Sequence, residues 1–161
     1  MKKVKYLIVG IVFLVLLIVI IGIFFGKKSV QKKDAKSIND FENTVSKNEF
    51  IFLDNIGSYA DVDYITDAKK GILDSIVIEM IVYKDEKSAK KVQDEQIKNF
   101  KTIKNTATTE HKDEGNNYYK FWMVSNGYYM VSSRIDNTLI FCKTLLENKE
   151  KVENILESMK Y

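Results

Sequence analysis

The chain has 161 residues and a formal net charge of +3, which leaves too little length for two large domains. The positive charge is unevenly placed. Residues 1–33 contain seven lysines and no acid, whereas the sequence from Asp34 onward contains 18 basic and 22 acidic residues, a net charge of −4. The composition therefore excludes a large basic surface on the main part of the chain, and we expect no nucleic-acid partner.

The first recognisable element is an apolar run at residues 6–25, which contains no charged side chain. At about 1.5 Å per residue, such a helix spans the roughly 30 Å of bilayer hydrocarbon. We therefore predict a single transmembrane helix that places the chain in the cell membrane, with the lipid bilayer as its partner. The lysines that follow it are expected to contact anionic lipid headgroups: Lys27, Lys28, Lys32 and Lys33.

No small-residue cleavage site ends the apolar run, so residues 1–28 are predicted to remain as a signal anchor. Residues 29–36 are interpreted as a juxtamembrane linker, and residues 37–161 as one extracytoplasmic domain behind a cytoplasmic N-terminus. The count of nearby lysines, three before the run and five after it, favours the opposite orientation. A regulatory or assembly subunit facing the cytoplasm is therefore the alternative. This layout resembles that of small envelope proteins of Gram-positive bacteria.

The domain begins with alternating helix and strand signals. Ser37 and Asp40 form a capping box in front of a predicted helix at 38–46. Residues 49–54 and 75–83 are rich in β-branched and aromatic residues and are predicted strands. Asp85 can cap a helix at 86–103, whereas residues 58–70 are ambiguous and residues 104–117 show no periodicity and are predicted to form a loop.

Three further strands are predicted with their register. Asn126–Gly127 is a strong hairpin signal because a type I′ turn needs positive φ at both central residues. This turn pairs Trp122 with Val131, and a second turn at residues 136–137 pairs Val131 with Cys142. The three residues then share one sheet face. A final helix is predicted at 147–159.

We therefore predict an α+β domain in which helices pack on a mostly antiparallel sheet of four or five strands. The sheet has more aromatic residues than one buried face needs. One face is expected to be core, and the other is expected to be covered by a helix or to bind a partner. The candidate partner-binding residues on this second face are Tyr119, Phe121, Met123, Met130, Arg134 and Phe141.

The residues available for catalysis are few. His111, the only histidine, lies in a polar segment, and Cys142, the only cysteine, lies in an apolar strand. Asp61, Asp63 and Asp67 lack the glycine and closing glutamate of a calcium loop. We expect no catalytic residue, metal or cofactor, and we interpret the domain as a non-catalytic binding or accessory module. A hydrolase that uses Asp61, Asp63 and Glu79 is the less favoured alternative.

Overall fold

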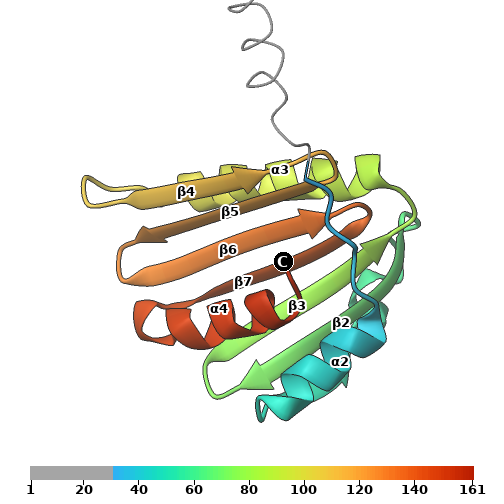
Figure 1. Ribbon diagram of the computed structural model, residues 1–161. Helices are drawn as coiled ribbons and strands as arrows, with labels where there is room; N and C mark the ends of the chain where they lie inside the picture. Colours follow the sequence, from blue (N-terminus) through green and yellow to red (C-terminus); the bar gives the residue numbers. More distant parts are fainter. Residues whose placement is uncertain (1–30) are drawn as a thin grey trace, which may run out of the picture. The chain divides into compact units, whose positions relative to one another are not determined.

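The computed structural model describes residues 31–161, in which Lys32–Tyr161 forms one compact unit. Its core is a single sheet of seven strands with three α-helices and two short 3-10 helices (Figure 1). The strands are β1 (Ile51–Asp54), β2 (Ile65–Leu73), β3 (Ile76–Tyr83), β4 (Thr109–Glu114), β5 (Tyr118–Ser125), β6 (Tyr128–Ile135) and β7 (Thr138–Leu145). The helices are α2 (Ile38–Lys47), η1 (Ile56–Tyr59), α3 (Glu86–Lys101), η2 (Leu146–Asn148) and α4 (Lys149–Ser158).

The strands are ordered β1-β2-β3-β7-β6-β5-β4, and every neighbouring pair is antiparallel. The predicted sheet of four or five strands is therefore wrong. The two strands that the prediction missed are β2, which lies mostly in the ambiguous stretch 58–70, and β4, which replaces part of the predicted loop. All six side chains of β4 are exposed, because this strand forms one edge of the sheet. Its polar sequence therefore carries no hydrophobic alternation.

The prediction of a transmembrane helix is not supported. Among residues 31–161, no helix is long and apolar enough to cross a membrane. The longest of them, α3, has 16 residues, and charged side chains cover much of its surface. The predicted span at residues 6–25, together with Lys27 and Lys28, lies outside the described residues. The structure thus gives no support to a single-pass anchor, and we withdraw it together with the membrane localisation that depended on it.

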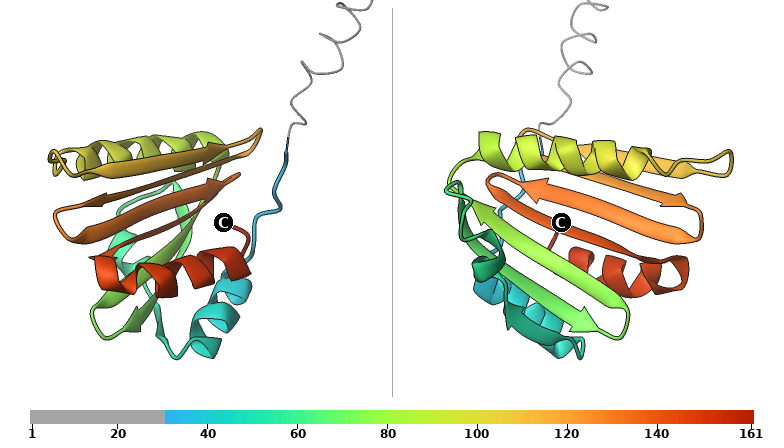
Figure 2. Two further views of the ribbon diagram at one scale, coloured as in Figure 1. Left: turned by 60° about the vertical axis from the view of Figure 1, so that its left-hand side comes forward. Right: turned by 180° about the vertical axis from the view of Figure 1, so that it is seen from behind.

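The helices lie on both faces of the sheet (Figure 2). Helices α2 and α4 cover one side, which we call the inner face, and α3 crosses the other side, the outer face. The largest hydrophobic cluster lies under α2 and α4 and includes Phe41, Ile78, Val131, Cys142 and Ile155. Two smaller clusters lie on the outer face, one at each end of α3. Burial on both faces explains why β3 shows an almost continuous apolar run.

The predicted hairpin register is confirmed. Trp122 pairs with Val131, and Val131 pairs with Cys142. Asn126 and Gly127 have φ angles of +52° and +77°, as a type I′ turn requires. Side chains therefore alternate between the two faces along β5, β6 and β7 as the sequence indicates, and the candidate partner-binding residues all belong to the outer face.

Candidate functional site

Helix α3 covers most of the candidate partner-binding residues. Phe121, Met123 and Met130 are buried and pack with Ile97 of α3, and half-buried Tyr119 lies at the margin of this cluster. Phe141 is half-buried in the second outer-face cluster, around Ala89 of the same helix. The prediction left open a helix cover or a free face, and the structure shows the helix over this region. The apolar residues of this set therefore pack within the domain in this conformation.

A polar network connects α3 to the sheet between these two clusters. Gln93, which is 1% exposed, donates from Nε2 to the main-chain oxygens of Tyr119 at 2.8 Å and Ser132 at 3.2 Å. Its Oε1 accepts a hydrogen bond from Nε of Arg134 at 3.3 Å. Nη1 of Arg134 donates to Glu86 at 2.8 Å and to the main-chain oxygen of Asp136 at 3.1 Å. Arg134 is therefore held rigidly at the base of this interface.

The sequence indicates this network only in part. The residues at helical spacing in this segment include Ala89, Val92, Gln96, Phe100 and Ile103, but the buried residues of α3 are Ala89, Gln93 and Ile97. Gln93 was missed because a glutamine is ordinarily placed on the solvent side of an amphipathic helix. Its position four residues after Ala89 and four before Ile97 is the signal that could have identified it.

Helix α3 leaves part of the outer face open. Viewed from the α3 side, parts of strands β6, β7 and β3 lie beside α3 and are not covered by it (Figure 2, right), while η1 packs on β3 near Glu79 and Ile81. Large apolar side chains that are 39–66% exposed lie on this part of the sheet, and we call them the open outer patch: Ile51, Leu53, Val77, Tyr128 and Leu145.

The strand register shows that the open outer patch spans several neighbouring strands. Ile51 of β1 pairs with Ile72 of β2, and Ile72 pairs with Val77 of β3. Tyr128 of β6 pairs with Leu145 of β7. Paired residues point to the same face, so these side chains form adjacent rows across the sheet. Exposed apolar side chains that adjoin one another on a sheet are a feature of interaction sites.

Two lysines lie within the same part of the outer face. Lys70 of β2 pairs in register with Leu53 and with Glu79, and Lys143 of β7 lies with its Nζ 5.1 Å from the centre of the Tyr128 ring. Among the described residues, neither lysine forms an ion pair with an acid. The open outer patch is therefore apolar and carries two lysines that form no ion pair within residues 31–161.

Glu79 makes hydrogen bonds within the fold and does not lie with Asp61 and Asp63, the other carboxylates considered for a hydrolase. It is buried on the outer face beside η1, and its Oε1 accepts hydrogen bonds from Asn55 Nδ2 and from the hydroxyl of Tyr59. Burial and the nearby carboxylate of Glu79 raise the pKa of Tyr59 well above its usual value. Asp61 and Asp63 are exposed in the turn after η1 and share no hydrogen bond or ion pair with Glu79.

The remaining candidate residues are scattered. Asp67 lies in β2 and pairs with Lys69 at 3.8 Å, and His111 lies on exposed β4, where its ring stacks on Trp122 at 5.6 Å. Cys142 is fully buried, and burial raises the pKa of its thiol to about 12. Within residues 31–161, no group of three or more His, Cys, Asp or Glu side chains is arranged to hold a metal ion.

Of the lysines expected to contact lipid, Lys33 instead contacts the domain. Its backbone N–H donates to Asn117 Oδ1 at 3.1 Å, and Asn117 Nδ2 donates to the main-chain oxygen of Lys33 at 2.7 Å. The Lys33 Nζ lies 4.1 Å from the centre of the Tyr118 ring and 3.7 Å from Asp113. These contacts tie the segment before α2 to the β4–β5 hairpin.

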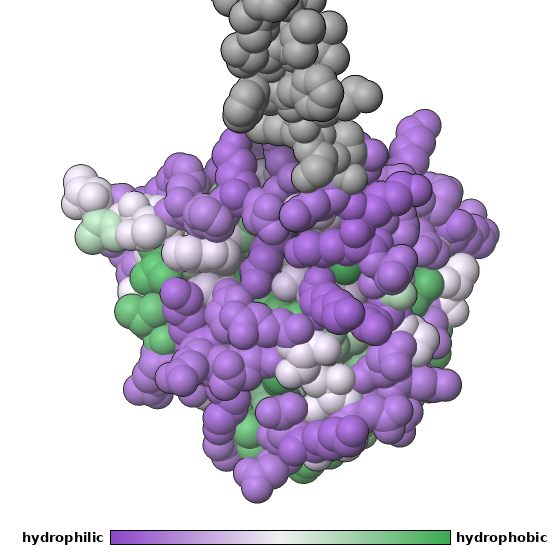
Figure 3. All heavy atoms as spheres, viewed as in Figure 1, coloured by the Kyte–Doolittle hydropathy of each residue, from purple (hydrophilic) through white to green (hydrophobic). Residues whose placement is uncertain are grey.

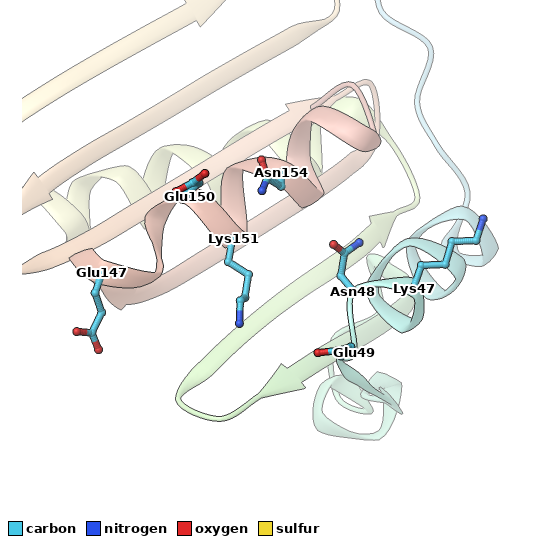
Figure 4. A pocket seen from close by; sticks show the side chains of 7 residues that line it. All are labelled: Lys47, Asn48, Glu49, Glu147, Glu150, Lys151 and Asn154. Carbon is cyan, nitrogen blue, oxygen red and sulfur yellow. The ribbon is translucent and has the colours of Figure 1, made fainter.

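The inner face carries a polar cleft between α2 and α4, with a volume of about 490 Å³ (Figure 4). Its charged side chains do not converge: Lys47 extends away along α2, and Glu147 points outward from η2, just before α4. The surface on this side of the molecule is mostly hydrophilic, with only small separate hydrophobic patches (Figure 3). Neither the cleft nor its surroundings presents a set of groups directed at one ligand.

Comparison with known proteins adds little to this description. No family model and no curated protein matches the chain. Among solved structures, it is similar to a GTP binding regulator from Thermotoga maritima, with 18% identity and a TM-score of 0.47 over 80% of this chain and 91% of the other. A likeness at this score carries no argument about the function of this chain.

Proposed function

We propose that the domain is a non-catalytic binding module that receives a protein partner on the open outer patch. The observation that supports this most directly is the exposure of Ile51, Val77 and Leu145 on a sheet face that α3 covers only in part. Burying apolar side chains against a partner contributes about 25 cal/mol per Å² of area removed from water. A partner that covers these rows would therefore complete the packing that α3 begins.

The charge of the patch indicates the chemistry of the partner. Lys70 and Lys143 lie among the apolar side chains, and neither forms an ion pair among the described residues, although Lys70 lies opposite Glu79 in register. A partner surface with apolar side chains and one or two carboxylates would match both features. Such charge complementarity contributes mainly to specificity and to the association rate.

Site-specific photo-crosslinking of the full-length chain in cells tests the proposal. A photoreactive residue in place of Val77 is expected to form an adduct with a discrete protein. The same residue in place of Lys98, which is exposed on the solvent side of α3, serves as the matched control and is expected to form none. Reversal of both patch charges, Lys70→Glu with Lys143→Glu, should reduce the Val77 adduct at least several-fold. Equal labelling from positions 77 and 98, or none from either, would contradict the proposal.

A further inference from the structure

The geometry points to a second binding site, away from the open outer patch, that takes a small zwitterion of amino-acid size. The site is the cleft between the first half of α3 and the β4–β5 hairpin, which we call the Arg134 cleft. Its volume is about 360 Å³, and Lys90, Asp94, Glu114, Gly115, Tyr119 and Arg134 are among the residues that line it. We propose that Arg134 binds the carboxylate of the ligand and that Glu114 binds its ammonium group.

The guanidinium of Arg134 is built into the base of the cleft. Its side chain is only 7% exposed, and Nε and Nη1 are fixed by Gln93, Glu86 and the main-chain oxygen of Asp136. Nη2 donates no hydrogen bond within residues 31–161, and Arg134 lines the cleft. A preorganised arginine that keeps one donor nitrogen free is suited to a carboxylate. Arg134 is also the only arginine among 25 basic residues.

The charges around the cleft select a ligand that carries both signs. Lys90 is already paired with Asp94 at 3.2 Å and Arg134 with Glu86 at 2.8 Å, which leaves the Glu114 carboxylate and Nη2 of Arg134 without a partner among the described residues. A simple amine would occupy Glu114 alone, and a phosphate would bring its negative charge close to that carboxylate, at an electrostatic cost. A zwitterion places its carboxylate beside Arg134 and its ammonium beside Glu114, which forms no ion pair with any described lysine or arginine.

Tyr119 supplies a further neutral contact. It is half-buried on β5, and its partner in register on β4 is Glu114. Burial, followed by the charges of Glu114 and Asp94, raises the pKa of its hydroxyl, so the group stays protonated and can donate to a carboxylate. The aromatic ring of Tyr119 provides a small apolar wall of the cleft. This combination limits the ligand to an amino acid or a short peptide.

Titration of the full-length protein with L-alanine tests the assignment. The amide signal of Gly115 is expected to shift during the titration, with saturation in the millimolar range because the cleft is partly open. L-Alaninamide lacks the carboxylate and N-acetyl-L-alanine lacks the ammonium group, so each is expected to bind on the order of tenfold more weakly.

Two exposed glutamates of β4 provide a matched pair of variants. Glu114→Gln should weaken alanine binding on the order of tenfold, whereas Glu110→Gln, on the same strand and face but outside the cleft, should leave it unchanged. Thermal melting of both variants checks that the fold is retained. The assignment is overturned if Gly115 does not shift up to about 50 mM alanine, if Glu114→Gln binds like its parent, or if both blocked derivatives bind as well as alanine.

Discussion

The hydroxyl of Tyr83 is buried and makes no hydrogen bond within the described part of the chain. The ring packs with Ala68 and Ala89 and stacks on Tyr64 at 6.3 Å, and burial raises the pKa of the hydroxyl well above its usual value. Removing a buried polar atom that has no partner recovers its desolvation cost. Tyr83→Phe is therefore expected to raise the free energy of unfolding by about 1 kcal/mol, measured by urea denaturation.

Tyr129→Phe is the control for this prediction. Tyr129 is equally buried, but its hydroxyl donates to the carboxylate of Glu153, which also accepts from Lys120 at 2.8 Å. Loss of a hydrogen bond to a charged group is expected to lower the free energy of unfolding by about 2 kcal/mol. If Tyr83→Phe instead lowers the free energy of unfolding, as Tyr129→Phe is expected to do, the Tyr83 hydroxyl has a hydrogen-bond partner in solution.

At the scale of elements, two helices begin with carboxylates that titrate in acid. Asp40 accepts hydrogen bonds from the backbone and side chain of Ser37, and Asp85 accepts from the backbone N–H of Ser88 at 2.7 Å. These hydrogen bonds lower the pKa of both carboxyls below the usual value of 3.8. Both groups therefore stabilise the folded state above pH 3.8, and this contribution is lost as the pH falls through their lowered pKa values.

The double variant Asp40→Asn with Asp85→Asn tests this linkage. Asparagine retains an oxygen that can cap a helix, so we expect melting near neutral pH to change little. Because carboxyl groups titrate at about pH 4, the comparison covers the range from about pH 5 to about pH 2. Over this range, the melting temperature of the variant should fall less steeply than that of the parent. Parallel curves for the two proteins would show that these caps do not contribute to acid sensitivity.

Local signals in the sequence predict some of these elements and miss others for physical reasons. The Ser37–Asp40 box, Asp85 and the Asn126–Gly127 turn each depend on neighbouring residues, and the structure confirms all three. Strand β4 depends on pairing with β5, and its own side chains are polar because they face water. Strand β2 contains Lys69, Lys70 and Gly71 in succession, which interrupt its apolar alternation.

From the sequence, only the sheet face that carries the candidate site could be predicted. The alternation of β5 and β6 places Tyr119, Phe121 and Arg134 on the outer side, as the register confirms. Which part of that side is open depends on where α3 crosses it, and a helix's own sequence does not define its path over a sheet. The open outer patch also uses Ile51 and Val77 from the other half of the sheet, which no short-range pattern connects to β5.

At the scale of the whole molecule, the sheet ends in two different edge strands, β1 and β4, and its central strand pairs with β3, which is distant in the sequence. Strand β7 lies fourth of seven, between β3 and β6, and joins the two halves of the sheet. Amide hydrogen exchange measures local opening, which is hardest for buried backbone with partners on both sides. We expect the amides of Ile78, Met80 and Ile140 to be the most protected, and those of β1 and β4 to exchange fastest among the strands. Slow exchange along β4 would indicate that its free edge is paired in solution.

The central position of β7 also has a consequence for biosynthesis. Strand β3 pairs with β7 from Ile78–Cys142 to Val82–Thr138, so its second edge stays unpaired until those later residues leave the ribosome. At about 5–20 residues per second, the roughly 55 residues between them take several seconds to make. During that interval the nascent chain exposes an apolar strand that belongs at the middle of the finished sheet. Chaperone contact with this chain is therefore expected to be strongest after residue 83 has emerged and to end once residue 145 is available.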